Sequence, residues 1–397
     1  MEDKVLQKLA ERYGTPSYLF DADEVVRRAV DIKQIMNDGP ENRSIGLCFS
    51  IKANPFLIPA LKDVVDHFEV CSPGELSICM KYEVPGKKII YSGVHKDEWD
   101  TGEALRYGCD VLTAESAGQY DLILKKAEEL KIKAAVILRI SSGSQFGMSV
   151  EDAESILKTY DKDGFTDIQG LHYFVGTQRL KLKHQKEELK KLKETVAELR
   201  RKYGLELSKL EYGPGLGYPY FEDDDRSDTL RPIRELAEDL KETAGWCQLT
   251  VEMGRFLASS CGYYMTKVVD KKTSGGRNWA IMDGGINHIN YHGQMMGLKV
   301  PVIKILGKDP LREADKDVSS WALCGSLCTV NDVIVREYKT SVFEIGDVFV
   351  FLNAGAYSVT EAMGLFLSRD LPKVAVVHKD GSGEEIRDRL STWKLNS

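Results

Sequence analysis

Several features are absent from this sequence, and each absence excludes a class of protein. No apolar run approaches the roughly 20 residues that a membrane-spanning helix needs, so no membrane partner is expected. Met1–Lys4 carry no apolar stretch, so no signal peptide is expected. Basic residues are not in excess: 54 Lys and Arg stand against 61 Asp and Glu, and a net charge of −7 gives no sign of nucleic-acid binding. The eight cysteines form no CxxC pair, which favours reduced thiols in a cytoplasmic protein without a metal site.

The chain does contain a regular alternation of short apolar runs and amphipathic segments. Eight runs have the length and apolar character of buried strands. They are Ser44–Ser50, His67–Cys71, Lys88–Ser92, Cys109–Thr113, Ala134–Ile140, Ile168–Val175, Lys209–Tyr212 and Gln248–Val251. Most gaps between them have the apolar spacing of helices, most clearly Gln119–Lys131 and His184–Tyr203. Eight strand–helix repeats within about 210 residues predict an α/β fold, a (β/α)8 TIM barrel.

A different pattern follows Phe256. Strand-like runs are there separated by turn signals such as Ser274-Gly275-Gly276, which is typical of a β-rich domain. These runs are Tyr263–Val269, Asn278–Met282, Ser319–Leu323, Val333–Arg336, Asp347–Leu352 and Lys373–His378. The short run Pro16–Phe20 precedes the barrel and can add a strand to the same domain. The expected domains are a barrel at 22–256 and a β domain, a sandwich or small barrel, made of 1–21 and 257–397, in which the role of the loop 293–318 is open.

The most informative single residue is Lys52, which ends the first barrel strand. Barrel enzymes keep their chemistry at the C-terminal ends of strands, whereas a solvated lysine usually lies on an amphipathic face. An amine held at a strand end can lose its proton by desolvation and form a Schiff base with a carbonyl cofactor. The alternative is a lysine that only caps a buried strand.

Three other strand ends carry groups that suit one ligand. The sixth strand runs into His172–Gln178, the seventh ends in Gly213–Gly217, and the eighth ends in Glu252–Arg255. Glycine turns let backbone N–H groups approach an anion, and Arg255 adds a fixed charge, so we expect a phosphate site opposite Lys52. Each turn alone is usually only a turn, and it is the combination that indicates a ligand.

Pyridoxal phosphate has the three groups that this set of residues would bind. Its aldehyde suits Lys52, and its phosphate suits the glycine turns and Arg255. A carboxylate beside its pyridine nitrogen keeps that nitrogen protonated, and Glu252 is the candidate for this role. The alternative role for Glu252 is a salt bridge with Arg255.

The same motifs occur, in the same order, in the fold-type III pyridoxal-phosphate decarboxylases, which this chain resembles over nearly its whole length. The shared motifs are Ser-Ile-Lys-Ala-Asn, His-x-x-x-Gly-Thr-Gln, Gly-x-Gly-Leu-Gly, Glu-Met-Gly-Arg, Cys328-Thr-Val-Asn-Asp332 and Gly355-Ala-Tyr357. The family includes diaminopimelate, ornithine and carboxynorspermidine decarboxylases, and the chain looks most like the diaminopimelate branch and its diverged bacterial relatives. The resemblance implies a barrel of the alanine racemase type, pyridoxal 5'-phosphate as cofactor, an amino-acid substrate and a homodimer.

The resemblance also implies roles for single residues. Lys52 would bond the cofactor and Glu252 would pair with its ring nitrogen. Cys328 would protonate the substrate carbon in the neighbouring subunit's active site, with Asp332 beside it near the substrate amine, which makes the dimer a catalytic requirement. On its own, Cys328 would more often be a small buried residue, and the motif order favours the catalytic role. The other implied cofactor contacts are Glu69, Arg139, His172, Phe174, Gly176, Thr177, Gly215, Gly217, Gly254, Arg255 and Tyr357, the last of which is alternatively a core aromatic.

Three positions depart from the diaminopimelate decarboxylases. Where the family usually stacks a histidine on the ring, this chain has Phe174, with His172 two residues earlier on the same strand face. Thr329 occupies the position at which diaminopimelate decarboxylases have a glutamate that binds the distal amine of the substrate. The stretch Gly285–Gln294 lacks the arginine that binds the distal carboxylate. Loss of such charged contacts weakens binding by several kcal/mol, and the candidate substrate residues in their place are His288, Asn290, Tyr291 and Thr329.

The predicted function is α-decarboxylation of an amino acid other than plain meso-diaminopimelate, such as an acylated or carrier-linked amino acid or a siderophore or antibiotic precursor. Three alternatives stay open: a genuine diaminopimelate decarboxylase that makes L-lysine, an amino-acid racemase on the same fold, and a catalytically dead regulatory homologue. Pro55-Phe56 differs from the sequence that follows the lysine in racemases. The intact Lys52, Glu252, Arg255 and Cys328 argue against a dead homologue.

Overall fold

The structure, a computed structural model, describes residues 1–39, 44–308, 318–340 and 343–397, so residues 309–317 of the loop 293–318 lie outside the described residues. The chain forms two compact units. The first contains residues 1–26, 219–227 and 258–397, and the second contains residues 27–218 and 228–257. The segment 219–227 joins the first unit because Phe221 pairs with Pro301, and the Tyr220 hydroxyl lies 2.6 Å from Ser259 Oγ. The expected domain limits stay a prediction.

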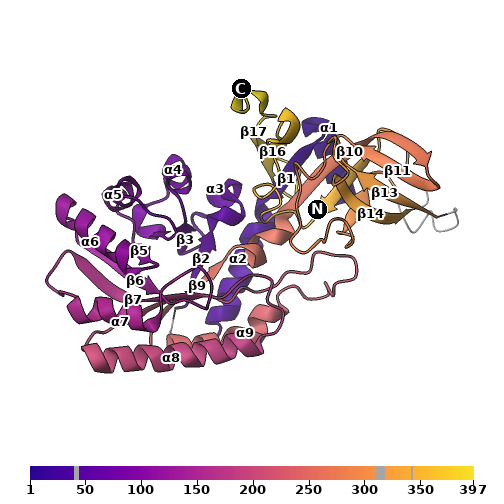
Figure 1. Ribbon diagram of the computed structural model, residues 1–397. Coiled ribbons are helices and arrows are strands. Elements are labelled where there is room, and N and C mark those ends of the chain that lie inside the picture. Colours follow the sequence, from indigo (N-terminus) through magenta and orange to yellow (C-terminus); the bar gives the residue numbers. More distant parts are fainter. Residues whose placement is uncertain (40–43, 309–317, 341–342) are drawn as a thin grey trace. The chain divides into compact units, whose positions relative to one another are not determined.

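Eight parallel strands close the second unit into a barrel, which confirms the predicted fold (Figure 1). In chain order they are β2 (Gly46–Ser50), β3 (His67–Val70), β4 (Ile89–Tyr91), β5 (Val111–Ala114), β6 (Ala134–Arg139), β7 (Thr166–Phe174), β8 (Lys209–Gly213) and β9 (Gln248–Met253). Each strand pairs with the next, and β9 pairs with β2. Most of their residues are buried, because a parallel barrel strand faces the interior on one side and helices on the other, and this is why they are apolar runs.

Helices precede and separate the barrel strands. They are α2 (Ala22–Asn37), α3 (Ile58–Leu61), α4 (Pro73–Lys81), α5 (Glu98–Tyr107), α6 (Ala117–Leu130), α7 (Val150–Thr159), α8 (Lys183–Tyr203), α9 (Arg231–Ala244) and α10 (Arg255–Ala258). Four of the helices that follow a barrel strand begin after a residue whose side chain accepts a hydrogen bond from the backbone N–H three residues later, namely Ser72, Asp97, Ser116 and Ser149. These caps fix where the helices begin, at the barrel end where ligands bind in this fold.

The first unit is a mixed sheet, with nine strands among the described residues, and a helix, α1 (Asp3–Tyr13). The strands are β1 (Ser17–Asp21), β10 (Gly262–Ser274), β11 (Arg277–Met282), β12 (Ile303–Ile305), β13 (Ser319–Cys324), β14 (Val333–Thr340), β15 (Val348–Leu352), β16 (Lys373–Val377) and β17 (Gly383–Arg387). β1 lies between antiparallel β10 and parallel β16, so the prediction that Pro16–Phe20 adds a strand here is confirmed. Leu6 and Leu9 of α1 share a core cluster with Leu19 and Met265.

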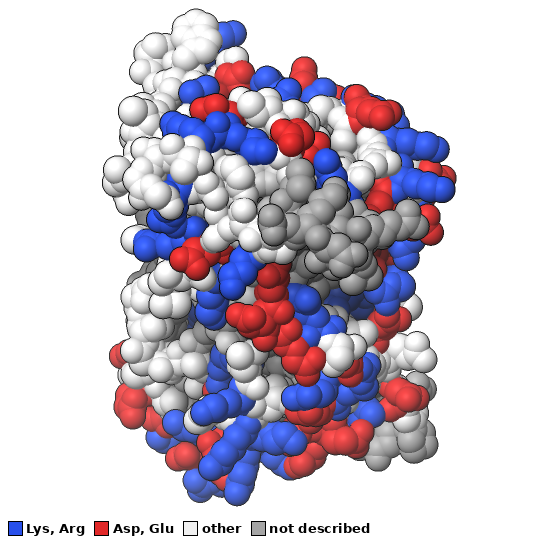
Figure 2. All heavy atoms as spheres, turned by 90° about the vertical axis from the view of Figure 1, so that its right-hand side faces the viewer, with Lys and Arg blue, Asp and Glu red and all other residues white. Residues whose placement is uncertain are grey.

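Charges of both signs are mixed on the face of the molecule shown in Figure 2. Lys and Arg side chains alternate there with Asp and Glu over the described atoms, in line with the nearly balanced composition. No helix within the described ranges is both long enough and apolar enough to cross a membrane. The chemically distinctive groups lie inside the barrel instead.

Candidate functional site

Lys52 lies directly after β2, in the 3-10 turn Ile51–Ala53, at the C-terminal end of the barrel. Its Nζ donates hydrogen bonds to both carboxylate oxygens of Glu69 on β3, at 2.7 and 3.0 Å. The same nitrogen lies 3.8 Å from Oε1 of Glu252 on β9. The side chain of Lys52 is 39% exposed, whereas that of Glu69 is 3% exposed. The arrangement therefore presents an accessible amine that buried carboxylates hold in place.

Glu252 is the centre of a buried hydrogen-bond network. Its Oε1 accepts a hydrogen bond from Ser50 Oγ at 2.8 Å, and its Oε2 lies 3.2 Å from Nε2 of His172 on β7. Burial would raise the pKa of Glu252, but the hydrogen bond with His172 and the charge of Lys52 outweigh it and hold that pKa well below its ordinary value. Glu252 is therefore a carboxylate at neutral pH and can accept a hydrogen bond from a protonated nitrogen.

Cys71 belongs to this cluster, although the sequence analysis did not single it out. It follows β3, two residues after Glu69, and therefore lies on the same strand face. Its Sγ donates to Glu69 Oε1 at 3.1 Å and lies 3.5 Å from Lys52 Nζ. Burial and the neighbouring charge of Glu69 raise the pKa of Cys71 well above its usual value, so it remains a thiol. The two-residue spacing from Glu69 was the signal that could have found it.

Two glycine turns are bound to each other at the ends of β7 and β8. Gly215 has a φ of +61°, and a Cβ there would lie 1.7 Å from the carbonyl oxygen of Gly176, so only glycine fits. The backbone N–H of Arg179 donates to the Gly215 carbonyl at 2.9 Å. The Gln178 side chain bonds the backbone N and O of Tyr218, at 2.6 and 3.0 Å. The predicted phosphate-binding turns thus form one tightly packed element.

Arg255, the first residue of α10, contacts this element. It is buried, and its Nε donates to Oγ1 of Thr177 at 3.1 Å. Gly254 precedes it in the turn after β9, and Gly217 is packed so closely that a Cβ would lie 2.5 Å from Leu180. A buried guanidinium beside a hydroxyl group and glycine turns has the chemistry of an anion site.

Arg139 and Phe174 end the neighbouring strands β6 and β7. Arg139 pairs with Glu115, which the sequence analysis did not single out, at 2.7 Å between Nη1 and Oε1. Its guanidinium also lies 4.8 Å from the ring centroid of Phe146. Phe174 packs closely on Gly213, where a Cβ would lie 2.5 Å from its ring. The charge of Arg139 is therefore balanced by that of Glu115, and the ring of Phe174 packs against the glycine turn.

The predicted residues of the β domain are described within their own unit. Asp332 is buried, and its two carboxylate oxygens accept hydrogen bonds from the backbone N–H groups of Ile286 and Leu327, at 2.9 and 2.7 Å. It therefore ties the loop that carries Cys328 and Thr329 to the stretch after β11. Cys328 is exposed and Thr329 is half-buried. Their catalytic and substrate contacts stay predictions.

Two of the predicted substrate residues lie in the interior of that unit. His288 Nε2 lies 2.8 Å from the Asp370 carbonyl oxygen, and Nδ1 lies 3.2 Å from the Tyr264 hydroxyl. Burial lowers the pKa of His288 to about 4, so it is neutral at neutral pH. The Tyr291 hydroxyl donates to the Leu352 carbonyl at 2.6 Å. These contacts support structural roles, and a contact of either residue with substrate stays a prediction.

Asn290 and Tyr357 are the other two predicted contacts from the β domain. Asn290 is exposed, and Tyr357 is half-buried. Tyr357 has a φ of +64°, which is uncommon for an aromatic residue, and its carbonyl accepts hydrogen bonds from the N–H groups of Thr360 and Glu361, at 3.1 and 2.8 Å. A tight turn therefore fixes the backbone of Tyr357.

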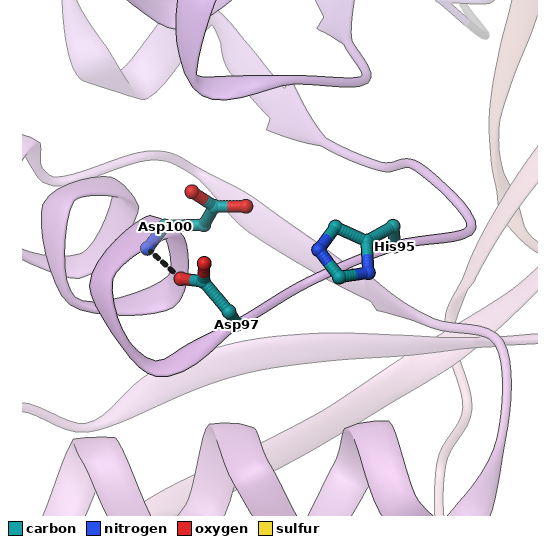
Figure 3. A group of neighbouring side chains, drawn as sticks. All are labelled: His95, Asp97 and Asp100. Carbon is teal, nitrogen blue, oxygen red and sulfur yellow. Dashed lines mark hydrogen bonds between the residues drawn. The ribbon is translucent and has the colours of Figure 1, made fainter.

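Figure 3 shows a separate group formed by His95, Asp97 and Asp100, whose possible ligand atoms lie within 4.8 Å of one another. Such donors suit a cation. However, Asp97 caps α5 by accepting a hydrogen bond from the N–H of Asp100 at 2.8 Å. Acidic residues are favoured in the first turn of a helix by its dipole. The start of α5 therefore accounts for Asp97 and Asp100, and His95 lies in the loop before it.

A buried lysine lies in the loop after β4. Lys96 is 7% exposed, and its Nζ donates to the Gly93 carbonyl at 2.7 Å. Burial lowers the pKa of Lys96 to about 8, so a fraction of this amine is neutral near neutral pH. Lys96 and Lys52 are therefore two candidates for covalent chemistry, and they differ in accessibility.

A known protein family matches the barrel part of this chain. Residues 22–259 match the family model described as the pyridoxal binding domain of pyridoxal-dependent decarboxylases. The match spans all eight strands of the barrel and includes Lys52, Glu252 and Arg255.

Curated relatives and solved structures match nearly the whole chain. The L-glutamyl-(BtrI acyl-carrier protein) decarboxylase of Niallia circulans is 27% identical, over 98% of this chain and 94% of the relative. The diaminopimelate decarboxylase of Zymomonas mobilis is 26% identical, over 100% of this chain and 95% of the relative. The structure of M. jannaschii diaminopimelate decarboxylase in complex with L-lysine gives a TM-score of 0.86 at 24% identity, over 98% of this chain and 93% of that one. The structural likeness shows a shared fold.

Proposed function

We propose, from the premise that the chain belongs to the pyridoxal-dependent decarboxylases, that it releases the α-carboxyl group of an amino acid as CO2 with pyridoxal phosphate as cofactor. The observation that carries this proposal is the network of Lys52, Glu69 and Glu252. It lies at the same barrel end as the paired glycine turns and Arg255. An amine, a low-pKa carboxylate and an anion site at one end of a barrel are the groups this chemistry needs.

The residues at this end of the barrel fit the groups of pyridoxal phosphate. The amine of Lys52 suits the aldehyde, and the ionised carboxylate of Glu252 suits a protonated ring nitrogen. Arg255 and Thr177 suit the phosphate, beside the turn in which a Cβ at Gly215 would have no space. When bound, pyridoxal phosphate supplies an electron sink for the electron pair that CO2 leaves behind.

The chain's own residues hold charges and protons around this sink. Glu69 orients the amine of Lys52 and stabilises its protonated form through a 2.7 Å contact. Glu252 stays ionised, and its carboxylate would hold a proton on the ring nitrogen of bound pyridoxal phosphate. The reaction consumes one proton at the α carbon, and we assign its delivery to the exposed thiol of Cys328, on the loop that Asp332 anchors.

The proposed substrate has no free charged pair at its distal end. Thr329 carries no charge for a distal ammonium, and the stretch Gly285–Gln294 contains no arginine for a distal carboxylate. A distal zwitterion would lose its water without regaining matched charges. The relative from Niallia circulans is named for a glutamyl group on an acyl-carrier protein. An acylated or carrier-linked amino acid therefore suits this chain better than meso-diaminopimelate.

CO2 release from a panel of amino acids tests this function and its substrate class. We expect turnover of an amino acid with an acylated distal end, and a kcat/KM on meso-diaminopimelate below about 10⁴ M⁻¹s⁻¹. A higher value on meso-diaminopimelate would support the second candidate, a genuine diaminopimelate decarboxylase, which the identity with the Zymomonas mobilis enzyme favours. If cofactor-loaded protein releases no CO2 from any member of the panel, the decarboxylase proposal is wrong.

A shared active site across a two-fold interface is the proposed reason for a homodimer. Lys52→Ala and Cys328→Ala subunits are each expected to be inactive. Mixed together, they should regain about a quarter of wild-type activity, because half of the exchanged dimers are mixed and each has one intact site. Each variant mixed with itself is the control. Verified subunit exchange without recovery of activity would place the whole site within one chain.

A further inference from the structure

Glu211, the third residue of β8, is a buried acid with no role in the function proposed so far. It faces the barrel interior, since its register partner on β7 is His172, whose Nε2 contacts Glu252 there. Both carboxylate oxygens of Glu211 are buried, and neither has a hydrogen-bond partner among the described residues. Nδ1 of His172 is also buried and has no hydrogen-bond partner among the described residues. Because buried polar atoms are nearly always bonded, these three atoms indicate bound water.

A cavity of about 150 Å³ provides space for water beside Glu211. Glu211 and Thr250 form part of its wall, together with His67, Lys209 and Gln248, the first residues of β3, β8 and β9. The cavity therefore occupies the N-terminal end of the barrel, opposite the end that holds Lys52. Its wall also includes the apolar residues Ile90, Val111, Ile137 and Leu210, and the cavity is large enough for several water molecules.

The charges around Glu211 come mainly from other acids. Glu252 lies two residues beyond Thr250, the register partner of Glu211, and thus one layer, about 7 Å, further along the barrel. Burial and then the charges of Glu252 and Glu69 raise the pKa of Glu211 well above its usual value. The titratable groups facing it from the surrounding strands and the cavity are Cys48, Lys52, His67, Glu69, Asp110, Arg139, His172, Lys209 and Glu252.

The surroundings therefore favour the protonated form of Glu211 and the ionised form of Glu252. An acid held in its protonated form can give that proton to a stronger base, such as a neutral amine. A buried acid also lowers the stability of the fold, so its presence inside the barrel favours a functional reason.

We propose that Glu211 and the water in this cavity form a proton-uptake route into the active site through the N-terminal end of the barrel, an inference that rests on the proposed decarboxylase function. Loss of CO2 from R–CH(NH3⁺)–CO2⁻ leaves an electron pair on the α carbon, which takes up one H⁺ to give R–CH2–NH3⁺. Each turnover therefore draws one proton from solvent. Glu211 passes its proton to the amine of Lys52 when that amine is neutral, while Glu252 stays ionised, and regains one from cavity water. Lys52 then restores the proton that the donor to the α carbon has given up.

Infrared difference spectroscopy tests the proton on Glu211 without any turnover. The spectrum of the wild type minus that of Glu211→Gln, both loaded with pyridoxal phosphate at pH 7, should show the C=O band of a protonated carboxylic acid that shifts in D2O. Glu198→Gln makes the same change at an exposed acid on α8, and its difference spectrum should show carboxylate bands alone. A difference spectrum for Glu211→Gln without the protonated band overturns the proposal.

The pH dependence of folding stability in the same variants tests independently whether Glu211 is protonated in the folded protein. An acid with a raised pKa keeps its proton in the folded state, whereas the unfolded chain releases it above about pH 4.3. As the pH rises, the folded-to-unfolded ratio of the wild type should therefore fall relative to Glu211→Gln, by up to about tenfold per pH unit, until Glu211 itself ionises. Urea unfolding from pH 4 to pH 8 measures this. A ratio between the two proteins that is constant with pH overturns the proposal.

Kinetics separate proton transfer from a structural role. Glutamine has the shape of the neutral acid, so a structural role predicts wild-type turnover in Glu211→Gln, whereas a proton route predicts at least tenfold lower kcat. KM and the cofactor absorption spectrum should not change, and the solvent deuterium isotope effect on kcat should increase. Unchanged kcat overturns the route. If the wild type itself releases no CO2, the decarboxylase function and the route both fail, while the infrared and stability data still decide whether Glu211 holds a proton.

Discussion

Replacement of Lys52 by alanine is expected to lower kcat for CO2 release by about 10³-fold or more. The reason is that Lys52 Nζ is the accessible amine at the C-terminal end of the barrel, held by two hydrogen bonds to Glu69. Borohydride reduction of cofactor-loaded protein, followed by peptide mapping, should also place the covalent label on Lys52. Loss of both turnover and label in Lys52→Ala would identify it as the residue that bonds the cofactor.

Lys96 provides the matched control for this experiment. It lies in the loop between β4 and α5, and its lowered pKa of about 8 makes it the rival nucleophile by acidity alone. Lys96 is 7% exposed, whereas the Lys52 side chain is 39% exposed, so accessibility favours Lys52. Lys96→Met should therefore keep the label on Lys52. Label on Lys96 in the wild type, or full turnover in Lys52→Ala, would contradict the assignment.

Replacement of Glu252 by glutamine should lower kcat by about 10²-fold or more. The amide keeps the shape of the side chain and can still bond Ser50 and His172. It removes the negative charge that would hold a proton on the ring nitrogen of the bound cofactor. The absorbance of cofactor-loaded Glu252→Gln should therefore change with pH at a lower pH than in the wild type. Steady-state kinetics and a spectroscopic pH titration measure the two effects together.

Ser50→Ala is the control that separates the charge of Glu252 from the geometry of its hydrogen bonds. It removes one hydrogen bond to Glu252 Oε1 and leaves the charge, so we expect a loss of about tenfold or less. If Ser50→Ala and Glu252→Gln were equally damaging, the network would matter through its geometry and not through its charge. A Glu252→Gln enzyme with wild-type turnover would remove Glu252 from the proposed mechanism.

The barrel was predictable because its strands are buried on both faces and therefore appear as apolar runs between amphipathic helices. β12 and β17 were missed for a physical reason. β12 has three residues, which is too short for a periodic pattern, and β17 is the largely charged segment Gly-Glu-Glu-Ile-Arg. Tertiary pairing with β15 and β16, and not local propensity, makes these two segments strands.

The candidate site was predictable where a residue type is rare for its position, as a lysine at a strand end or a Glu-Met-Gly-Arg turn is. Glu211 was not predictable as a site residue, because the segment Leu-Glu-Tyr-Gly is also typical of strands in which an acid faces solvent. Only the register with His172 shows that this acid faces the interior. The contact of Arg139 with Glu115 joins the end of β6 to the residue that follows β5, and no spacing along the chain encodes it.

The position of β1 in its sheet constrains the order in which the two units can fold during synthesis. β1 is made early, yet both of its neighbours come from far later in the chain, Gly262–Met265 on one side and Lys373–Val377 on the other. The strands of the barrel, residues 46–253, emerge before either neighbour. The nascent chain therefore carries Ser17–Asp21 without its sheet partners while the barrel strands are made, and the β unit can complete its sheet only after Lys373–Val377 has been made.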